Sequence, residues 1–394
     1  MSEKIPKGWK WLKVEDFAEV VSGGTPSTDK PEFWNGDIAW ITPKDLSDFK
    51  FRYIRRGERN ISRKGLESSN AKLLPKGTVL LSSRAPVGYL AIAKNELSTN
   101  QGFQSLVPKE NVITEYLYYL LKDNIEYLKS QASGTTFGEL SKSTLKKLLF
   151  LLPPLPEQKA IAEVLSSIDD KIDLLHRQNK TLEEMAMTLF RKCFIEPTKD
   201  ELPEGWEEVE LKDIYFLEKG IEPGSKNYLE TPSIDSIRFI RVGDMLDNKA
   251  NVYIQKDLVG NSICKFDDLL VSFDGTVGRV SFGLEGCYSS GIRKIYSKDE
   301  IYNKLWLKHQ IFISEEIQDE MNMHAEGTTI LHASSSIDYL SFAFPLKEKI
   351  EEYDKFFDPI YKKMLHNKKS IQTLEKLRDT LLPKLMSGEV MVKF

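Results

Sequence analysis

The sequence lacks most of the features that cross-link a chain or direct it to a membrane. Its 394 residues include three cysteines, too few and too scattered for a disulfide framework or a CxxC metal pair. No run of about 18 uncharged apolar residues occurs. The first residues, MSEKIPKGWKW, have no apolar segment of the kind that directs secretion. We therefore expect a cytoplasmic protein, without membrane contact, in which Cys193, Cys264 and Cys287 are packing residues.

Motifs for catalysis are also missing. The chain has no GxxxxGK(S/T) loop, no HExxH helix, no cluster of histidine and cysteine at ligand spacing, and no Asn-Pro-Pro-aromatic motif. Asp169, Asp170 and Asp173 could imitate a metal site, but their spacing on a long helix favours an exposed acidic face. The sequence thus predicts no catalytic, cofactor-binding or metal-binding residue.

Charge is distributed unevenly along the chain. The net charge is −4, yet residues 1–150 hold 23 basic residues against 17 acidic ones, a balance of +6. Residues 151–200 sum to −2 and residues 201–394 to −8. Much of the basic surplus lies in FRYIRRGERNISRKG, residues 51–65, where six basic side chains accompany one acidic side chain. Such a segment attracts phosphate, although a solvated loop or strand face explains a charge run equally well.

An internal repeat sets the domain organisation. IPKGWKWLKVEDF at residue 5 resembles LPEGWEEVELKDI at residue 202, with Pro6, Gly8, Trp9 and Asp16 recurring 197 positions later. Further similar pairs follow in the same order: DIAWITPKDL and SIRFIRVGDML, LLSSRAPVGYL and LVSFDGTVGRV, and SGTTFGELSKSTLKKLLFLLP and EGTTILHASSSIDYLSFAFPL. The preserved order predicts a tandem duplication rather than a solenoid of short repeats.

Each copy predicts the same order of elements. Short β-branched and aromatic runs between Gly, Pro, Asn and Asp predict strands, an apolar stretch after them predicts a helix, and a much longer helix closes the copy. We therefore predict an α+β protein with two similar mixed α/β domains, related by pseudo-twofold symmetry and joined by two long helices in an antiparallel coiled coil. The predicted domains span residues 1–153 and 197–345, and the helical regions span residues 154–196 and 346–394.

The two long helices carry a heptad pattern. In residues 161–193, positions that alternate by four and three are apolar, with Asn179 as the polar exception. The equivalent positions in residues 353–385 have Asn367 and Arg378 as exceptions. Antiparallel pairing that sets Asn179 against Asn367 makes paired residue numbers sum to 546 and sets the large apolar side chains of the two seams against each other. A buried asparagine pair would fix this register, and the alternatives are separate cores or pairing between chains.

Several segments together identify a family. They are PKGWKWLKVEDFAEVVSGGTPSTDKPEFWNGDIAWITPKDL, GTVLLSSRAPVGYLAI, STNQGFQSLVP, SGTTFGELSKSTLKKL and, most specifically, LPPLPEQKAIAEVLSSIDDKID. The second copy has FPLKEKIEEYDKFFDPI in place of the last motif, so only its position and its heptads support it. Over essentially its whole length, the chain resembles the specificity subunit of Type I restriction-modification systems.

The resemblance implies a sequence-specific DNA-binding subunit that is not itself an enzyme. In that family, two target recognition domains each read one half of a bipartite double-stranded DNA sequence, two helical regions form an antiparallel coiled coil between them, and two modification (methyltransferase) subunits bind. From the length of the helices, at about 1.5 Å per residue, we expect the coiled coil to set the spacer between the half-sites and to dock these subunits. Restriction subunits, with motor and nuclease activity, join through these. The chain would bind no cofactor, whereas S-adenosylmethionine, ATP and magnesium would be used by the partner subunits for adenine-specific DNA methylation and ATP-dependent cleavage.

Polar loop residues near strand ends are the expected DNA contacts, because Arg, Asn and Gln carry most direct base discrimination. In the first domain the candidates are Thr42, Lys44, Arg52, Arg55, Arg56, Ser83, Arg84, Asn100, Gln101 and Thr135. In the second they are Arg241, Asp274, Arg279, Ser290, Arg293 and Thr328, with a basic surface around Arg279, Arg293, Lys294, Lys304 and Lys308. A role in a turn, a cap or a strand end is the alternative for each of them.

The faces of the long helices outside their seam are the expected docking surfaces for the modification subunits. The candidates are Glu157, Gln158, Lys171, Arg177 and Lys180 on the first helix and Lys362, Lys363, Lys368 and Lys369 on the second, with a solvated face as the alternative. Two other function classes were considered. A scaffold protein would explain the helices but not two domains with similar polar loops, and an enzyme would require a catalytic motif that the sequence lacks.

Overall fold

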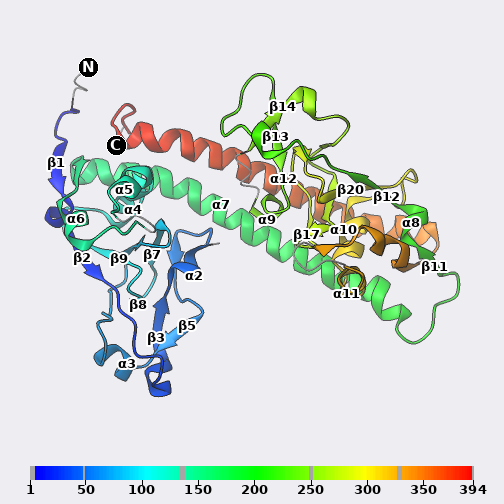
Figure 1. Cartoon of the computed structure of the whole chain (residues 1–394), viewed down its shortest axis with the longest axis horizontal. Helices are drawn as coiled ribbons and strands as arrows, with labels where there is room; N and C mark the ends of the chain where they lie inside the picture. The colour runs from blue at the N-terminus through cyan, green and yellow to red at the C-terminus, as the bar shows by residue number, and fades with distance from the viewer. Residues whose placement is uncertain (1–4, 48, 134–137, 248–251, 326–330, 393–394) are drawn as a thin grey trace. The chain divides into compact units, whose positions relative to one another are not determined.

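The computed structural model describes residues 5–47, 49–133, 138–247, 252–325 and 331–392. The chain forms two compact units, one of residues 1–174 and 373–394 and the other of residues 175–372. Each unit contains one copy of the repeat together with part of each of two long helices, α7 (Leu155–Phe190) and α12 (Lys347–Met386) (Figure 1). Within the residues described, no helix is both long and apolar enough to span a membrane.

The described strands of the first unit form a five-stranded sheet of order β2-β9-β6-β7-β4, a three-stranded sheet β5-β3-β8 and a ribbon β1-β10. The strands are β1 Lys10–Lys13, β2 Ala18–Ser22, β3 Trp34–Ile41, β4 Tyr53–Ile54, β5 Arg59–Ile61, β6 Val79–Ser83, β7 Val87–Ala93, β8 Ser98–Thr99, β9 Gln104–Pro108 and β10 Leu149–Leu152. The shorter helices are α1 Val14–Phe17, α2 Pro43–Ser47, α3 Arg63–Glu67, α4 Thr114–Asp123, α5 Ile125–Ser130 and α6 Lys142–Lys147.

The described strands of the second unit form two four-stranded sheets, β12-β20-β16-β18 and β14-β13-β19-β15, and the pairs β11-β22 and β17-β21. The strands are β11 Glu207–Glu210, β12 Phe216–Lys219, β13 Ser236–Ile240, β14 Tyr253–Gln255, β15 Ile263–Cys264, β16 Leu269–Ser272, β17 Asp274–Gly275, β18 Val280–Ser281, β19 Gly286–Tyr288, β20 Ile292–Tyr296, β21 Leu331–His332 and β22 Ser341–Phe344. The shorter helices are α8 Leu211–Ile214, α9 Asp244–Asp247, α10 Leu305–Ile313 and α11 Glu315–Met323.

The topology of the two units confirms the duplication. The order β2-β9-β6-β7 recurs as β12-β20-β16-β18, and β5-β3-β8 recurs as β14-β13-β19. In both units the latter sheet contains a parallel pair, β3 with β8 in the first and β13 with β19 in the second. The ribbons share one register, because Lys10 pairs with Leu152 in the first and Glu207 with Phe344 in the second. The predicted mixed α/β domains on long helices are therefore confirmed.

The core of each unit is continuous with the helix pair. In the first unit one cluster joins Leu106 of β9, Tyr116 of α4, Ile161 of α7 and Leu385 of α12, and all four are almost completely buried. In the second unit Trp306 of α10 stacks on Phe357 of α12, with ring centres 4.3 Å apart. Stacked, fully buried aromatic pairs stabilise a core beyond the area that they remove from water. Each domain is thus packed directly on its helices.

The motif LPPLPEQ is explained by the contacts at the start of α7. Trp9 Nε1 donates a hydrogen bond to Glu157 Oε2 at 3.1 Å. Gln158 Oε1 accepts from the Ile113 N–H at 3.0 Å, and Gln158 Nε2 donates to the Pro153 carbonyl at 3.0 Å. Both helix residues are buried. The prediction that Glu157 and Gln158 form a docking surface is therefore wrong, because their side chains satisfy buried polar groups within the first unit.

The seams of the long helices pair antiparallel within each unit. Ile161 of α7 lies in the same core as Leu385 of α12, and Leu182 of α7 in the same core as Met364 of α12, so rising numbers in one helix meet falling numbers in the other. Asn367 Nδ2 donates to Asn179 Oδ1 at 2.9 Å. The two asparagines therefore face each other, as the sum of 546 requires.

The cysteines are free thiols. Cys264 and Cys287 are buried, and Cys193 is half-buried at the end of α7, where a π-helical turn, Arg191–Ile195, follows the helix. Burial raises the pKa of Cys264 to about 12 and that of Cys287 to about 11. Both thiols are protonated and unreactive at neutral pH, as expected for packing residues.

Candidate nucleic-acid interface

The basic segment of the first domain presents several charged side chains to solvent. Arg55 and Arg56 lie between β4 and β5 and are exposed, and exposed Arg59 begins β5. Lys44 of α2 is also exposed and forms an ion pair with Glu58 at 3.1 Å. An exposed ion pair of this kind contributes little and can exchange for another anion. The segment therefore offers a compact set of cations for phosphate groups.

Arg59 is held in a defined orientation by two tryptophans. Its guanidinium carbon lies 3.6 Å from the centre of the Trp34 ring and 5.5 Å from that of Trp40. Trp40 pairs with Arg59 across the β3–β5 ladder, and the two indoles meet edge to face. Stacking on a ring restricts an arginine while its N–H groups stay available for hydrogen bonds in the plane. The individual DNA contacts predicted from sequence did not include Arg59, although it belongs to the basic segment, residues 51–65, that was expected to attract phosphate.

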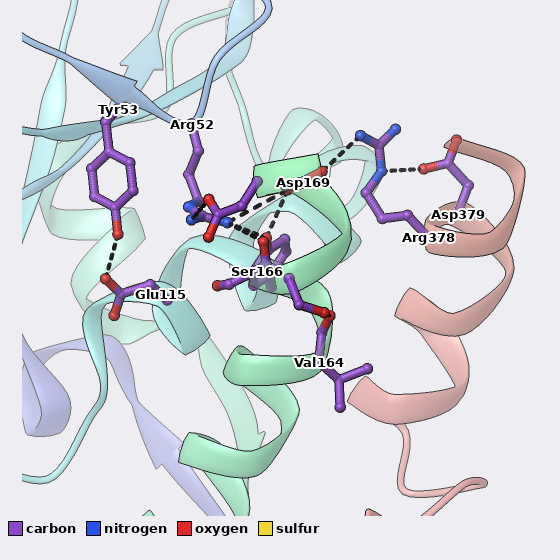
Figure 2. A network of polar contacts seen from close by, with 11 residues as sticks. Arg52, Tyr53, Glu115, Val164, Ser166, Asp169, Arg378 and Asp379 are labelled. Atoms are coloured by element: carbon purple, nitrogen blue, oxygen red, sulfur yellow. Dashed lines mark hydrogen bonds and ion pairs between the residues drawn. The ribbon is translucent and has the colours of Figure 1, made fainter. Parts of the chain in front are cut away.

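Arg52, in contrast, is buried and belongs to a network that joins the first domain to both long helices (Figure 2). Its Nη2 lies 2.7 Å from Asp170 Oδ1, and its Nη1 donates to the Tyr119 hydroxyl at 2.8 Å. Tyr119 in turn donates to Asp169 Oδ2 at 2.7 Å, and Arg378 Nη1 donates to Asp169 Oδ1 at 3.0 Å. The prediction of Arg52 as a DNA contact is therefore wrong, as is the prediction of an exposed face for Asp169.

The contacts of this network favour the ionised forms of Asp169 and Arg378. Burial alone would raise the pKa of Asp169, but Lys122, the Tyr119 hydroxyl and Arg378 together lower it below its ordinary value. Burial would likewise lower the pKa of Arg378, but its contacts with Asp379 and Asp169 raise it. Asp169 and Arg378 are therefore charged throughout the neutral range, and they lie 3.0 Å apart as partners of opposite charge. We call Arg52, Tyr119, Asp169, Asp170 and Arg378 the first joint.

Three further candidates in the first domain stabilise their own loops. The Thr42 N–H and hydroxyl both donate to Asp45 Oδ2 at 2.7 Å, at the start of α2. Ser83 is buried and donates to the Gly102 carbonyl at 3.2 Å, whereas Asn100 Oδ1 accepts from the Gly102 N–H at 2.9 Å. The prediction of Ser83 as a contact is wrong for this reason. Thr42 and Asn100 are half-buried and shape the loops that carry their neighbours.

The remaining first-domain candidates differ in exposure. Gln101 is exposed and its Oε1 accepts a hydrogen bond from the Thr25 hydroxyl, and Arg84 is half-buried after β6. Thr135 and its counterpart in the second domain, Thr328, lie outside the described residues.

Most of the predicted DNA contacts in the second domain form hydrogen bonds or ion pairs with other residues of the protein. Arg241 is exposed and forms a bidentate ion pair with Asp244, with distances of 2.9 and 3.2 Å. Arg293 is 5% exposed, donates to the Ser290 carbonyl at 2.5 Å and lies 3.6 Å from Asp274. The prediction of Arg293 as a DNA contact is therefore wrong. Asp274 and Ser290 are half-buried beside it.

The predicted basic surface of the second domain is not formed. Half-buried Arg279 donates to the Val242 carbonyl at 2.9 Å, Lys294 pairs with Glu218 at 2.8 Å, and Lys304 pairs with Asp354 at 2.7 Å. Lys308 is buried, and its ammonium group donates to the Ile295 carbonyl at 3.1 Å and to Asn303 Oδ1 at 2.8 Å. These cations offset acidic or carbonyl groups of their own domain.

A second joint links the second domain to α12. The Tyr361 hydroxyl lies 2.7 Å from His309 Nδ1 and accepts from Gln310 Nε2 at 2.8 Å. Asp354 Oδ1 accepts from Trp306 Nε1 at 2.6 Å. Burial, and to a lesser degree Lys368, lowers the pKa of His309 to about 3, so this imidazole is neutral. The second joint therefore relies mainly on neutral donors, unlike the first.

The outer faces of the long helices keep several of the predicted docking residues exposed. These are Lys171, Arg177 and Lys180 on α7 and Lys362, Lys363 and Lys369 on α12. Lys362 pairs with Asp358 at 2.7 Å, Lys369 pairs with Glu285 at 2.9 Å, and the half-buried Lys368 lies over the Phe282 ring. The exposed leucines Leu174 and Leu377 lie on the same helices, and the sequence prediction missed them because it considered only polar and charged residues.

The family model, the similar sequences and the similar structures all point to one protein family. The family model for the Type I restriction modification DNA specificity domain matches residues 6–184 and 203–376. The MjaIX specificity subunit of a Type I restriction enzyme from Methanocaldococcus jannaschii is 37% identical, over 99% of this chain and 95% of that protein. The MjaVIII specificity subunit from the same organism is 22% identical over the same shares. The solved S subunit of a Type I restriction-modification system from M. genitalium has the same fold, with a TM-score of 0.60, 17% identity, and coverage of 100% of this chain and 98% of that one.

Proposed function

This chain belongs to the family of Type I restriction-modification DNA specificity domains, and we propose that it selects a bipartite DNA sequence for a Type I restriction-modification complex. Each recognition domain would read one half-site. The observation that carries the proposal is the repeated topology, because two domains of like fold, each packed on the same helix pair, suit two separated half-sites. We assign residues 1–153 and 197–345 to recognition and residues 154–196 and 346–394 to the helical regions.

The exposed arginines support the first domain as a DNA-binding surface. Arg55, Arg56 and Arg59 would contact phosphate or base edges, with Arg59 oriented by its stacking on Trp34. Lys44, Arg84 and Gln101 remain candidates for further contacts. In the second domain Arg241, Arg279 and Ser290 remain candidates, and the bidentate pair of Arg241 with Asp244 would have to open or share its carboxylate.

The helix pair would set the distance between the half-sites. α7 has 36 residues, which span about 54 Å at 1.5 Å per residue. Insertion of four residues into each helix adds about 6 Å, close to the rise of two base pairs of DNA. Four-residue insertions are the stutters that coiled coils tolerate. The spacer should therefore lengthen by about two base pairs while both half-site sequences stay unchanged.

Membership of the family supports a role for this chain in a larger complex. We propose that it binds two methyltransferase subunits and, through them, restriction subunits, in the cytoplasm. S-adenosylmethionine, ATP and magnesium would be bound by those partners, and this chain would do no chemistry. The exposed faces of α7 and α12, including Lys171, Leu174 and Leu377, are the candidate docking surfaces.

Sequencing of methylated bases in cells with and without this chain tests the proposal. One asymmetric bipartite motif should lose its methylation when the chain is removed and regain it on complementation. Complementation with the four-residue insertions should restore methylation at the lengthened spacer. Unchanged methylation on removal would refute the function, and a new half-site sequence with the old spacer would refute the role of the helices.

A further inference from the structure

The first joint connects three elements through one carboxylate. Asp169 of α7 uses Oδ1 for Arg378 of α12 and Oδ2 for Tyr119 of α4 (Figure 2). Arg52, just before β4, closes the network from the domain side through Tyr119 and Asp170. The side chains of Arg52 and Asp169 are 4% and 9% exposed, so water cannot easily replace either partner.

The joint also marks the register of the helix pair. Arg378 occupies a seam position that otherwise calls for an apolar residue, and it meets Asp169, the residue next to the facing seam position. A slip of one helical turn moves Arg378 by about 5.4 Å and breaks this contact. Leaving a buried charge without its partner is strongly unfavourable, whereas an apolar seam layer would tolerate the slip. The first unit thus has an ionic register mark, as the second unit has Asn179 and Asn367.

The second joint does not combine these two tasks. Tyr361, the residue 192 positions after Asp169, contacts His309 and Gln310 of α10. These contacts of its hydroxyl lie in the domain, and the asparagine pair that marks the register lies six residues further along α12. In the first unit the same carboxylate serves both the domain and the opposite helix.

From this geometry we infer that Asp169 is a positioning residue for half-site spacing: it couples the register of the helix pair to the placement of the first recognition domain. The inference rests on the proposed function. Because Tyr119 and Arg52 connect Asp169 to the domain, a shift of Arg378 relative to Asp169 would also change the position of the domain. Loss of the joint should therefore leave the base sequences that are read unchanged and widen the range of spacers that is accepted.

Two substitutions separate positioning from folding. Asp169→Asn keeps the size of the side chain and removes the charge that pairs with Arg378. Arg378→Leu gives the seam an apolar residue, and Asp169 keeps the Tyr119 hydroxyl at 2.7 Å and the Arg52 guanidinium at 4.0 Å as partners. Because its carboxylate still faces a positive charge, this variant should fold even if the first variant does not. Glu163→Gln is the matched control, because it removes a carboxylate from the same helix at a place where its ion pair, with Lys159, is exposed and 3.9 Å long.

The assay uses the full chain with its partner subunits in cells that lack the resident copy. Plasmids carry the motif with the natural spacer or with one base pair more or fewer, and sequencing gives the methylated fraction of each. In both variants we expect the preference for the natural spacer to fall about tenfold, which corresponds to about 1.4 kcal/mol. Glu163→Gln should keep the wild-type preference.

The outcomes distinguish the inference from the function beneath it. An unchanged preference in folded Asp169→Asn and Arg378→Leu proteins overturns the inference, and so does an equal loss of methylation at every spacer, because that is what a merely structural role produces. If the wild-type chain directs no bipartite methylation, the proposed function fails instead. Altered half-site bases in the variants would also overturn the inference, since positioning alone does not change base contacts.

Discussion

Replacement of the asparagine layer should make the protein more stable and less specific in its helix pairing. Asn367 is fully buried and donates to Asn179 Oδ1 at 2.9 Å. Its own Oδ1 is buried and accepts no hydrogen bond from any residue in the described part of the chain. Asn179 is half-buried and its amide lies 3.5 Å from the Met364 carbonyl, a weak contact. The perturbation is the double substitution Asn179→Leu with Asn367→Leu.

The expected gain follows from three contributions. Removing a buried, unpaired acceptor relieves about 1–3 kcal/mol, and losing one hydrogen bond costs about 1 kcal/mol. Burying leucine at residue 367 contributes about 1.5–3 kcal/mol at most, and at residue 179 less, because that position is half-buried. The double variant should therefore be more stable by about 2 kcal/mol. Asn179→Leu alone should be less stable by about 1–3 kcal/mol, because Asn367 Oδ1 stays unpaired and Asn367 Nδ2 keeps only its 3.4 Å contact with Gln178 Oε1.

Guanidinium denaturation of the full chain, followed by the circular dichroism of its helices, measures the difference. The midpoint should rise for the double variant and fall for Asn179→Leu. A double variant less stable than the wild type would refute the reasoning, since it would mean that the asparagine layer stabilises the folded chain rather than only selecting its register. The spacing assay on the same variant should show a broader range of accepted spacers, as expected for a seam without this mark.

The other predictions concern single side chains. Arg59→Ala should weaken DNA binding by about 1 kcal/mol and reduce the salt dependence of binding by about one phosphate contact, as measured by DNA titration at several salt concentrations. Arg63→Ala should have a smaller effect, because the guanidinium group of Arg63 pairs with Glu67. Pro359→Ala should raise the free energy of unfolding, measured by the same denaturation, by up to about 3 kcal/mol, because this exposed proline lies inside α12 and cannot donate the helical hydrogen bond. Burial lowers the pKa of Lys308 to about 8, below its ordinary 10.5, so the unfolded chain binds the proton more tightly and stability should rise between about pH 8 and pH 10.5. Thermal unfolding at pH 7.5 and 9.5 should show this rise in the wild type and its loss in Lys308→Met, and an equal rise in both would contradict it.

The duplication and the helix pairing were predicted well because each depends on a repeating pattern of residues along the chain. Heptad spacing fixes which face of a helix is apolar, and two polar exceptions were enough to find the partner of Asn179. The contacts of Arg52 and Arg293 could not be predicted in this way. A run of charges does not reveal which member points inward, and the acidic partner of Arg52 lies 118 residues away on a helix. The seam exception at Arg378 was visible, but its partner Asp169 is displaced by one residue from the predicted layer.

The two joints show how duplicated domains have diverged at one position. In the first, the hydroxyl group belongs to the domain, on Tyr119 of α4, and the helix supplies the carboxylate of Asp169. In the second, the hydroxyl belongs to the helix, on Tyr361, and α10 of the domain supplies His309 and Gln310. Exchanging either side alone would bury a charge or an amide without a partner, at a cost of several kcal/mol. Each domain is therefore matched to its own place on the helix pair by chemistry that the shared fold does not determine.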